Sequence, residues 1–295
     1  MIVVPGSINL DLTARVERLP KPGETVQGPS FASAPGGKGA NQALAARRAG
    51  AEVVMIGAVG DDVQADSALE LLRSGGVDLS HVKTVVDSST GVALIMVDNA
   101  GGENMIAVVA GANAKVLSAD VEAVPLGPGD VVLAQSEIPP DTVLTAFARA
   151  RAAGALSIFN TAPFTADTPS LAGQADIVIA NETEFDLLSE VLSLEGASRK
   201  SRMAAFVERT GKTLVVTLGA DGAFAVTPDG KHRVAAPVIE PVDTVGAGDT
   251  FCGYLATALA EGMEWPAALD LAVRAGAAAC LKPGAQPAIP MRGEL

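Results

Sequence analysis

A chain of 295 residues in which 48% of the side chains are hydrophobic can bury a large core, and it lies near the upper length that one core usually supports. Its 34 acidic side chains outnumber its 21 basic ones, and the net charge of −13 argues against binding to nucleic acid or to an anionic membrane. We therefore expect one domain, residues 1–295, that acts on a small molecule.

The same composition bears on the compartment. Cys252 and Cys280 are too few and too far apart for a disulfide framework or a zinc ribbon. Met1 leads directly into an apolar strand, and neither a signal peptide nor an apolar run of membrane-spanning length is evident. We expect a cytoplasmic protein with reduced cysteines.

Short β-branched runs alternate with alanine- and leucine-rich helical stretches along most of the chain. The pattern runs through MIVVPG (1–6), GANQALAARRAG (39–50), EVVMIGAVG (52–60) and QADSALELLRSGG (64–76). It resumes with DVVLAQSE (130–137), DTVLTAFARARAAG (141–154), LSIFN (156–160), ADIVIAN (175–181), ETEFDLLSEVL (182–192), MAAFVERTG (203–211) and TLVVTLG (213–219). Two alanine-rich helices, about 247–262 and 264–281, complete the chain. This order predicts an α/β fold with a mostly parallel sheet covered on both faces.

Two segments depart from the alternation. Residues 10–34 and 90–110 have the character of antiparallel strands, with turn residues and no helix between them. We expect them to form a small β appendage that covers one edge of the main sheet.

The stretch DTVGAGDTFCG (243–253) combines glycine, two aspartates and the start of a helix. Gly246 and Gly248 leave the backbone free to turn, and a helix beginning near Ala247 directs unpaired N–H groups and a positive dipole end outward, which suits an anion. Asp249 would lie in the first helical turn, either as a partner of the helix dipole or as a catalytic base. Asp243 either caps the turn or has a role of its own.

Other glycine-rich stretches do not match the known phosphate-binding fingerprints. The sequence GKT at 211–213 is not a P-loop, because Phe206 stands where that motif begins with glycine. In GGKGANQ (36–42), Gln42 occupies the third glycine position of the dinucleotide fingerprint.

Polar residues follow several predicted strands, where open parallel sheets bind ligands. Asn9 and Asp11 follow the first strand, Asn41 lies near a helix start, and Glu137 ends a strand. Transfer of a phosphoryl group to an alcohol needs an anion site, a base and groups that orient the acceptor. These four residues could supply the groups that orient the acceptor. Alternatively, Asn9 and Asp11 are turn residues, Asn41 caps a helix, and Glu137 is a surface carboxylate.

Two further motifs have both a structural and a functional interpretation. Asn181 and Glu184 form the pattern of a capping box, but Asn181 also ends a strand. The turn TLGADG (217–222) is either a hairpin or a place where the backbone approaches a nucleotide. His81 and His232 have no partner motif, and we assign them no catalytic role.

Taken in this order, the motifs resemble those of the ribokinase-like (PfkB) carbohydrate kinases. The resemblance covers nearly the whole chain, in GSINLD, LPKPGETV, GGKGANQALAA, TGVALIMVD, GAN, NETE, TLGADG, DTVGAGDTF and GAQPAIP. It implies a doubly wound α/β domain with a small β-strand lid made by residues 10–34 and 90–110, and a homodimer formed through the lid. The implied reaction is ATP-dependent phosphorylation of D-ribose at O5; alternatives are another small sugar or nucleoside (2-deoxyribose, fructose, adenosine), or a protein on the same fold that binds sugar or nucleotide without catalysis.

The resemblance also implies a role for individual positions. Asp249 would be the base, beside the amides of Gly246, Ala247 and Gly248. The residues matching the sugar contacts are Asn9, Asp11, Gly37, Lys38, Gly39, Ala40, Asn41, Glu137 and Asp249. Those matching the ATP contacts are Asn181, Thr217, Leu218, Gly219, Ala220, Asp221, Gly222, Gly248 and Asp249.

Two metal ions follow from the resemblance. Mg²⁺ would bridge the ATP phosphates, with Glu184 as an indirect partner. A monovalent cation, K⁺, would be bound at the positions of Asp243, Val245, Ala279, Lys282, Gly284 and Ala288. Members of the family often have serine at the position of Ala288, and asparagine or histidine near the adenine at the position of Val273, so how adenine is held stays open.

Overall fold

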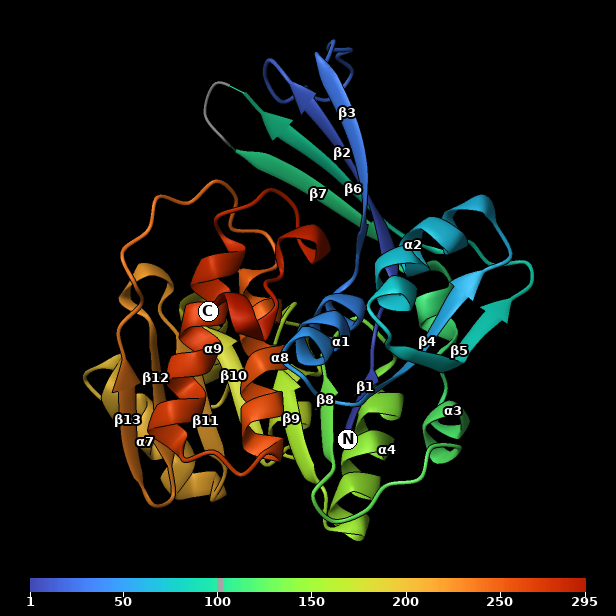
Figure 1. Cartoon of the computed structure of the whole chain (residues 1–295). Coiled ribbons are helices and arrows are strands. Elements are labelled where there is room, and N and C mark those ends of the chain that lie inside the picture. The colour runs from blue at the N-terminus through green and yellow to red at the C-terminus, as the bar shows by residue number, and fades with distance from the viewer. Residues whose placement is uncertain (100–102) are drawn as a thin grey trace.

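A large sheet forms the centre of the molecule, and the computed structural model describes residues 1–99 and 103–295 (Figure 1). Within these residues, nine strands pair in the order β13-β12-β11-β10-β9-β8-β1-β4-β5. Their bounds are β1 (Ile2–Pro5), β4 (Val53–Gly60), β5 (Asp78–Val85), β8 (Val131–Ala134), β9 (Leu156–Asn160), β10 (Ile177–Asn181), β11 (Thr213–Thr217), β12 (Ala223–Thr227) and β13 (Gly230–Val234). The pairs from β11 to β5 are parallel, and β12 and β13 add antiparallel strands at one end. The predicted mostly parallel α/β sheet is confirmed.

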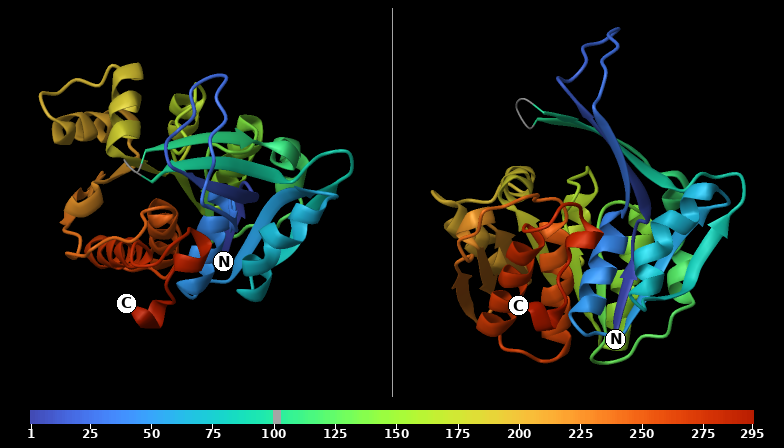
Figure 2. Two further views of the ribbon diagram at one scale, coloured as in Figure 1. Left: turned by 90° about the horizontal axis from the view of Figure 1, so that it is seen from above. Right: turned by 45° about the horizontal axis from the view of Figure 1, so that its top comes forward.

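Helices cover both faces of this sheet, as the view from above in Figure 2 shows. Their bounds are α1 (Lys38–Arg48), α2 (Val63–Ser74), α3 (Ser118–Glu122), α4 (Pro140–Ala153), α5 (Thr168–Ala172), α6 (Glu182–Val191), α7 (Arg199–Thr210), α8 (Ala247–Ala260) and α9 (Trp265–Ala279). One core cluster holds side chains of α1, α2, α8 and α9, and the other holds side chains of α3 to α7. Strand residues alternate between the two clusters, Ile2 and Val4 facing one and Val3 the other, because successive side chains of a strand point to opposite faces.

A second, smaller sheet of the described residues has the order β3-β2-β6-β7. It consists of β2 (Asn9–Val16), β3 (Ser30–Gly36), β6 (Gly91–Asp98) and β7 (Asn104–Val109); residues 100–102 of the expected segment lie outside the described residues. The expected antiparallel pairing holds for β2 with β3 and for β6 with β7, but β2 and β6 pair in parallel.

The position of this second sheet differs from the expectation. The edges of the main sheet are β13 and β5, and the second sheet covers neither. It stands above the carboxyl ends of the central strands (Figures 1 and 2), because β2 follows β1 after only three residues and carries the chain beyond the end of the main sheet. The second sheet therefore overhangs the place where open α/β sheets bind ligands.

Among residues 1–99 and 103–295, no helix combines the length and the apolar character needed to cross a bilayer. Cys252 and Cys280 are both buried free thiols.

Candidate active site

Asp249 lies in the first turn of α8 and is only 7% exposed. Its two carboxylate oxygens each accept an amide hydrogen bond from α1, one from Asn41 Nδ2 and one from Gln42 Nε2, both at 2.9 Å. The turn before it depends on glycine, since Gly246 has a φ of 77°, in the left-handed region. The amide of Ala247 donates to Thr244 O over 3.3 Å, a long bond. Asp249 is thus oriented by two amides at a helix N-terminus that favours anions.

Helix α1 approaches the turn between β1 and β2 so closely that only glycine fits there. A Cβ on Gly39 would lie 2.5 Å from Ser7 N, and Gly37, with a φ of 89°, would place one 2.8 Å from Asn9 N. The amide of Ala40 donates to Ser7 O, and the whole residue is buried, so Ala40 helps to pack α1 against the turn between β1 and β2.

Glu137 is held at the start of α1. One of its carboxylate oxygens accepts from Ser7 Oγ at 2.5 Å and from the amide of Lys38 at 3.0 Å. The residue lies three positions beyond the end of β8 and is half-buried, so it is neither the last residue of the strand, as expected, nor a free surface carboxylate.

Asn9 and Asp11 lie in β2, on the same face of the strand, and so are not turn residues. Asn9 is 3% exposed, and its side-chain oxygen accepts from Asn113 Nδ2 at 2.7 Å. Asp11 packs over Gly36, where an added Cβ would come within 2.2 Å of the Asp11 carboxylate. Asn41 occupies the fourth position of α1 and does not cap it, because Gly37 is the N-cap.

The charges at this end of the sheet perturb one another. Burial, with the nearby carboxylates of Glu137 and Asp249, raises the pKa of Asp11 from 3.8 to about 6, against the opposing charge of Lys38. The Asp249 carboxylate, with help from Glu137 and Glu184, raises the pKa of the Lys38 ammonium. The Lys38 ammonium therefore stays protonated among several carboxylates.

A hollow of about 400 Å³ lies on the other side of the α8 N-terminus and is mostly apolar. Residues of the predicted ATP segment line it, namely Thr217, Gly219, Ala220 and Gly222, whereas Leu218 and Asp221 do not. Val273 lines the same hollow. At this position, where family members often have asparagine or histidine, the hollow is therefore bounded by an apolar side chain. A smaller hollow of about 210 Å³, lined by Lys38, Asn181, Glu184 and Asp249 among others, shares Thr217, Thr244 and Gly248 with the first.

Asn181 and Glu184 form the predicted capping box at the start of α6. The amide of Glu184 donates to Asn181 Oδ1 at 2.8 Å, and the amide of Asn181 donates to Glu184 Oε2 at 3.0 Å. Thr161 Oγ1 donates to the same Glu184 oxygen at 2.9 Å. Because Glu184 also lines the smaller hollow, its carboxylate could contact Mg²⁺ there through water.

Two loops meet at Asp243. Its carboxylate accepts from the amide of Val245 at 3.0 Å and from that of Gly284 at 2.8 Å. Ala279 ends α9 and is buried, as is Ala288, while Lys282 is exposed and pairs with Glu294. Among the residues that the structure describes, no three His, Cys, Asp or Glu side chains are grouped to hold a metal ion.

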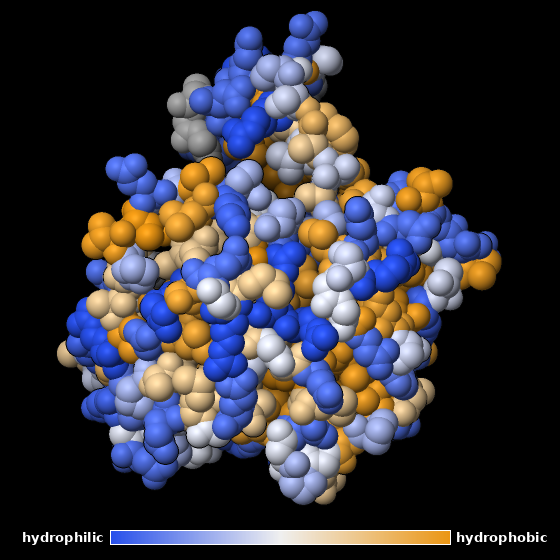
Figure 3. All heavy atoms as spheres, in the orientation of Figure 1, coloured by the Kyte–Doolittle hydropathy of each residue, from blue (hydrophilic) through white to orange (hydrophobic). Residues whose placement is uncertain are grey.

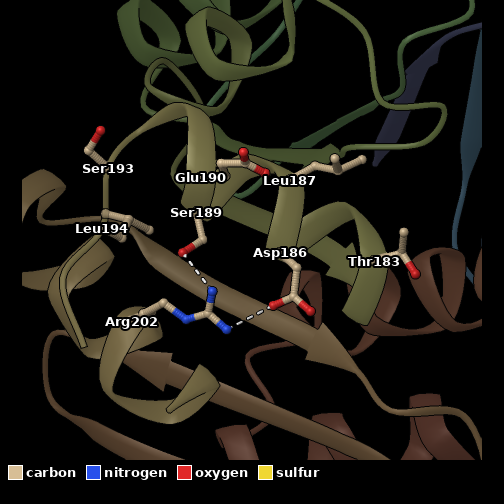
Figure 4. A pocket seen from close by; sticks show the side chains of 8 residues that line it. All are labelled: Thr183, Asp186, Leu187, Ser189, Glu190, Ser193, Leu194 and Arg202. Carbon is tan, nitrogen blue, oxygen red and sulfur yellow. Dashed lines mark hydrogen bonds and ion pairs between the residues drawn. The ribbon is translucent and has the colours of Figure 1, made fainter. Parts of the chain in front are cut away.

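A further hollow of about 650 Å³ opens between α6 and α7 (Figure 4). Its one arginine, Arg202, already bonds to Asp186 at 3.1 Å and to Ser189 at 3.4 Å. The arginine charge is thus neutralised within the wall, and we assign this hollow no chemistry.

Sequence reasoning missed several residues of the site. The apolar loop 236–241, in APVIEP, forms much of the larger hollow, and its two prolines among apolar residues were the available signal. Ser7, Asn113 and Gln42 act on residues far away in the sequence, and nothing local to them indicates those contacts.

Comparison with known proteins places this arrangement in a family, since the model for pfkB family carbohydrate kinases matches residues 1–292. The chain belongs to the pfkB family. It is 35% identical to a curated ribokinase of Staphylococcus aureus (strain COL), over 100% of this chain and 98% of that protein, and 33% identical to a deoxyribokinase of Salmonella typhi, over 98% and 95%. A solved structure of ribokinase from Arabidopsis thaliana, complexed with ribose and ATP, is 30% identical, with a TM-score of 0.86 over 99% of this chain and 96% of that one. The predicted pfkB membership is confirmed, and the chain is a carbohydrate kinase.

Proposed function

We propose that this pfkB enzyme transfers the γ-phosphoryl group of ATP to O5 of D-ribose, giving ribose 5-phosphate and ADP. The observation that carries the proposal is the position of Asp249. Its carboxylate lies between the polar groups around β2 and α1 and the apolar hollow beside β11 and α9. The similarity to ribokinases supports ribose as the sugar.

The sugar would occupy the polar side, under the second sheet. Asp11 and Glu137 would accept hydrogen bonds from the sugar hydroxyls, and the side chains of Asn9 and Asn41 would complete the set. Gly37, Lys38, Gly39 and Ala40 would contribute through the start of α1, which lies close to β2. Such a ring of fixed polar groups orients one primary hydroxyl toward Asp249.

ATP would place its base in the apolar hollow and its phosphates at the start of α8. Apolar walls and backbone from Thr217 to Gly222, together with loop 236–241, would hold the adenine without a specific side chain at Val273. Asn181 would lie beside the phosphates. The amides of Gly246 and Gly248, and that of Ala247 once freed from its long bond, would stabilise charge on the transferred group.

In the reaction, a lone pair of O5 would form a bond to the γ-phosphorus while the bond from that phosphorus to the bridging oxygen of ADP breaks. Asp249 orients the hydroxyl and accepts its proton late, when bonding to phosphorus has made it acidic. Lys38, kept protonated by the surrounding carboxylates, offsets the charge of the phosphates.

Two cations would assist. Glu184 and its neighbours fit a water-mediated contact to Mg²⁺, which when bound neutralises charge on the β- and γ-phosphates. Backbone carbonyls near Asp243, Val245, Ala279, Lys282, Gly284 and Ala288 would bind K⁺, which would steady the turn that leads into Gly246.

The second sheet would act as a lid and pair with the lid of another copy. It carries exposed large apolar side chains, which a second copy would cover: Phe31, Leu94, Met105, Ile106, Val108 and Val109. Figure 3 shows hydrophobic residues on the right-hand side of this sheet and toward its base, below a hydrophilic tip. Light scattering at micromolar concentration tests the lid dimer. A wild-type protein with the mass of a monomer, and the same mass for the Ile106→Glu variant, would refute it.

The test is ADP release, coupled to a reporter enzyme, against D-ribose, 2-deoxy-D-ribose, fructose and adenosine, with Mg²⁺ and with or without K⁺. We expect the highest kcat/KM for D-ribose, activation by K⁺, and a product whose ³¹P–¹H coupling places phosphate on O5. Preference for 2-deoxyribose would favour the deoxyribokinase alternative, which the similarity to that enzyme motivates. ATP binding without turnover of any sugar would favour a non-catalytic binding protein. We expect the enzyme to work in the cytoplasm, where ATP is supplied and its two thiols stay reduced.

A further inference from the structure

A chain of buried amides leads from the centre of the main sheet to Asp249. Gln135 Nε2 donates to Gln42 Oε1 at 2.7 Å, and Gln42 Nε2 donates to Asp249 Oδ1 at 2.9 Å. Gln42 Nε2 also donates to Asn160 Oδ1 at 3.1 Å. These bonds join α1, α8 and the ends of β8 and β9, which are far apart in the sequence.

Each amide in this chain could be turned either way, and neighbouring groups that can only accept a hydrogen bond decide which end is the NH₂ group. A carboxylate and a backbone carbonyl have no hydrogen to donate. Gln135 Nε2 also donates to Leu133 O at 3.4 Å, and Asn160 Nδ2 donates to Ile179 O at 3.3 Å. Asn160 Oδ1 therefore faces Gln42, Gln135 Oε1 faces away from it, and Gln42 presents its NH₂ group to Asp249.

Burial separates Gln42 from the substrate. Gln42 is 0% exposed and Gln135 is 1% exposed, whereas Asn41 and Asp249 keep 5% and 7%. The residue lines neither of the hollows that flank the α8 N-terminus. Any effect of Gln42 on the reaction must then pass through the groups it bonds to, of which Asp249 and Asn160 line the smaller hollow.

We propose that Gln42, anchored by Gln135, is a positioning residue that fixes the plane of the Asp249 carboxylate toward the acceptor hydroxyl. Asn41 holds one carboxylate oxygen and Gln42 the other, so together they prevent rotation about χ2 of the aspartate. Because the site is buried, both amides are ordered before substrate binds, and the orientation costs nothing during the reaction. This inference rests on the proposed role of Asp249 as the base.

The main test is Gln42→Met, which keeps the length of the side chain and removes its amide. We expect kcat to fall about 10- to 100-fold, because a small displacement of a reacting group costs about this much. The sugar KM, and the ATP Kd measured by calorimetry, should stay within about threefold, since Gln42 touches neither ligand. A general loosening of the fold would change these constants as well.

A double-mutant cycle separates positioning from other roles. In the Asp249→Asn background there is no carboxylate to orient, so Gln42→Met should lower the residual rate by less than about twofold. An equal loss in both backgrounds, or an unchanged kcat in the single variant, would overturn the proposal.

Thr257→Val is the matched control. Thr257 is 1% exposed and bonds across the same α1–α8 interface to Ala46 O at 3.2 Å, but it does not touch Asp249. We expect its kcat to stay within about twofold of the wild type. If Thr257→Val loses as much as Gln42→Met, interface packing explains the effect and the proposal fails.

Gln135→Met covers the case in which Gln42→Met does not fold, as judged by circular dichroism. It removes only the anchor, and we expect an intermediate loss of kcat, about 3- to 10-fold, with KM unchanged; no loss would overturn the proposal. Failure of the proposed function is a different result: a wild-type protein that phosphorylates no sugar, or an Asp249→Asn variant that turns over normally.

Discussion

Asp11 is predicted to lower the stability of the free enzyme, and the size of the effect follows from its surroundings. Its carboxylate is half-buried over Gly36 and lies near the negative charges of Glu137 and Asp249, with only Lys38 opposing them. The pKa of Asp11 is raised from 3.8 to about 6, a difference of 6 − 3.8 = 2.2. At 1.36 kcal/mol per pKa unit, ionised Asp11 costs the folded state up to about 3 kcal/mol.

The sign follows from proton binding. The folded protein holds the Asp11 proton more tightly than the unfolded chain, so this contribution to stability is fully present below pH 3.8 and is lost as the pH rises through about 6. Asp11→Asn removes the ionisable group. The variant should therefore be more stable than the wild type by about 1–3 kcal/mol above pH 7, and the difference should shrink toward pH 4.

Urea unfolding of both proteins between pH 4.5 and 8 measures this difference directly, with Asp61→Asn, an exposed carboxylate before α2, as the control that should show none. The same Asp11 variant should turn over sugar poorly, with the sugar KM raised more than about tenfold, because the proposed contact of the Asp11 carboxylate with the sugar hydroxyls is lost. A stability difference that does not depend on pH, or a variant less stable than the wild type at pH 8, would refute the reasoning.

Three further predictions concern other parts of the site. Asp249→Asn should lower kcat by about 10²- to 10⁴-fold with little change in ATP Kd, since the geometry survives and only the proton acceptor is lost; a near-normal rate would remove Asp249 as the base. Asp243→Ala breaks the bonds to the amides of Val245 and Gly284, so half-maximal activation by K⁺ should shift to higher concentration, and an unchanged K⁺ titration would count against the cation site. Gly39→Ala should cost about 1–3 kcal/mol in urea unfolding, because the new Cβ would lie 2.5 Å from the backbone of Ser7, whereas Gly293→Ala, with open space around it, should be neutral; equal effects would contradict this packing argument.

Local patterns in the sequence were enough for the fold class, and they drew attention to Asn41 and Asp249, which the structure brings into contact. The alternation of β-branched and helical stretches indicates which residues are buried between layers, and it predicted the parallel sheet. The last residues of α8 and α9 each lie two positions before the expected ones. Gly246 marks backbone that a side chain would block, whereas a Cβ on Gly248 would meet open space. The capping box of α6 was predicted from Asn181 and Glu184 alone.

Only the tertiary structure decided which polar groups act on one another. Asn41 meets Asp249 across 208 positions and Ser7 meets Glu137 across 130, so no spacing in the sequence indicates these bonds. The pKa of Asp11 depends on burial and on charges brought from α8 and from beyond β8. Desolvation and hydrogen bonding act through space at distances of a few ångströms, and the folded chain alone sets those distances.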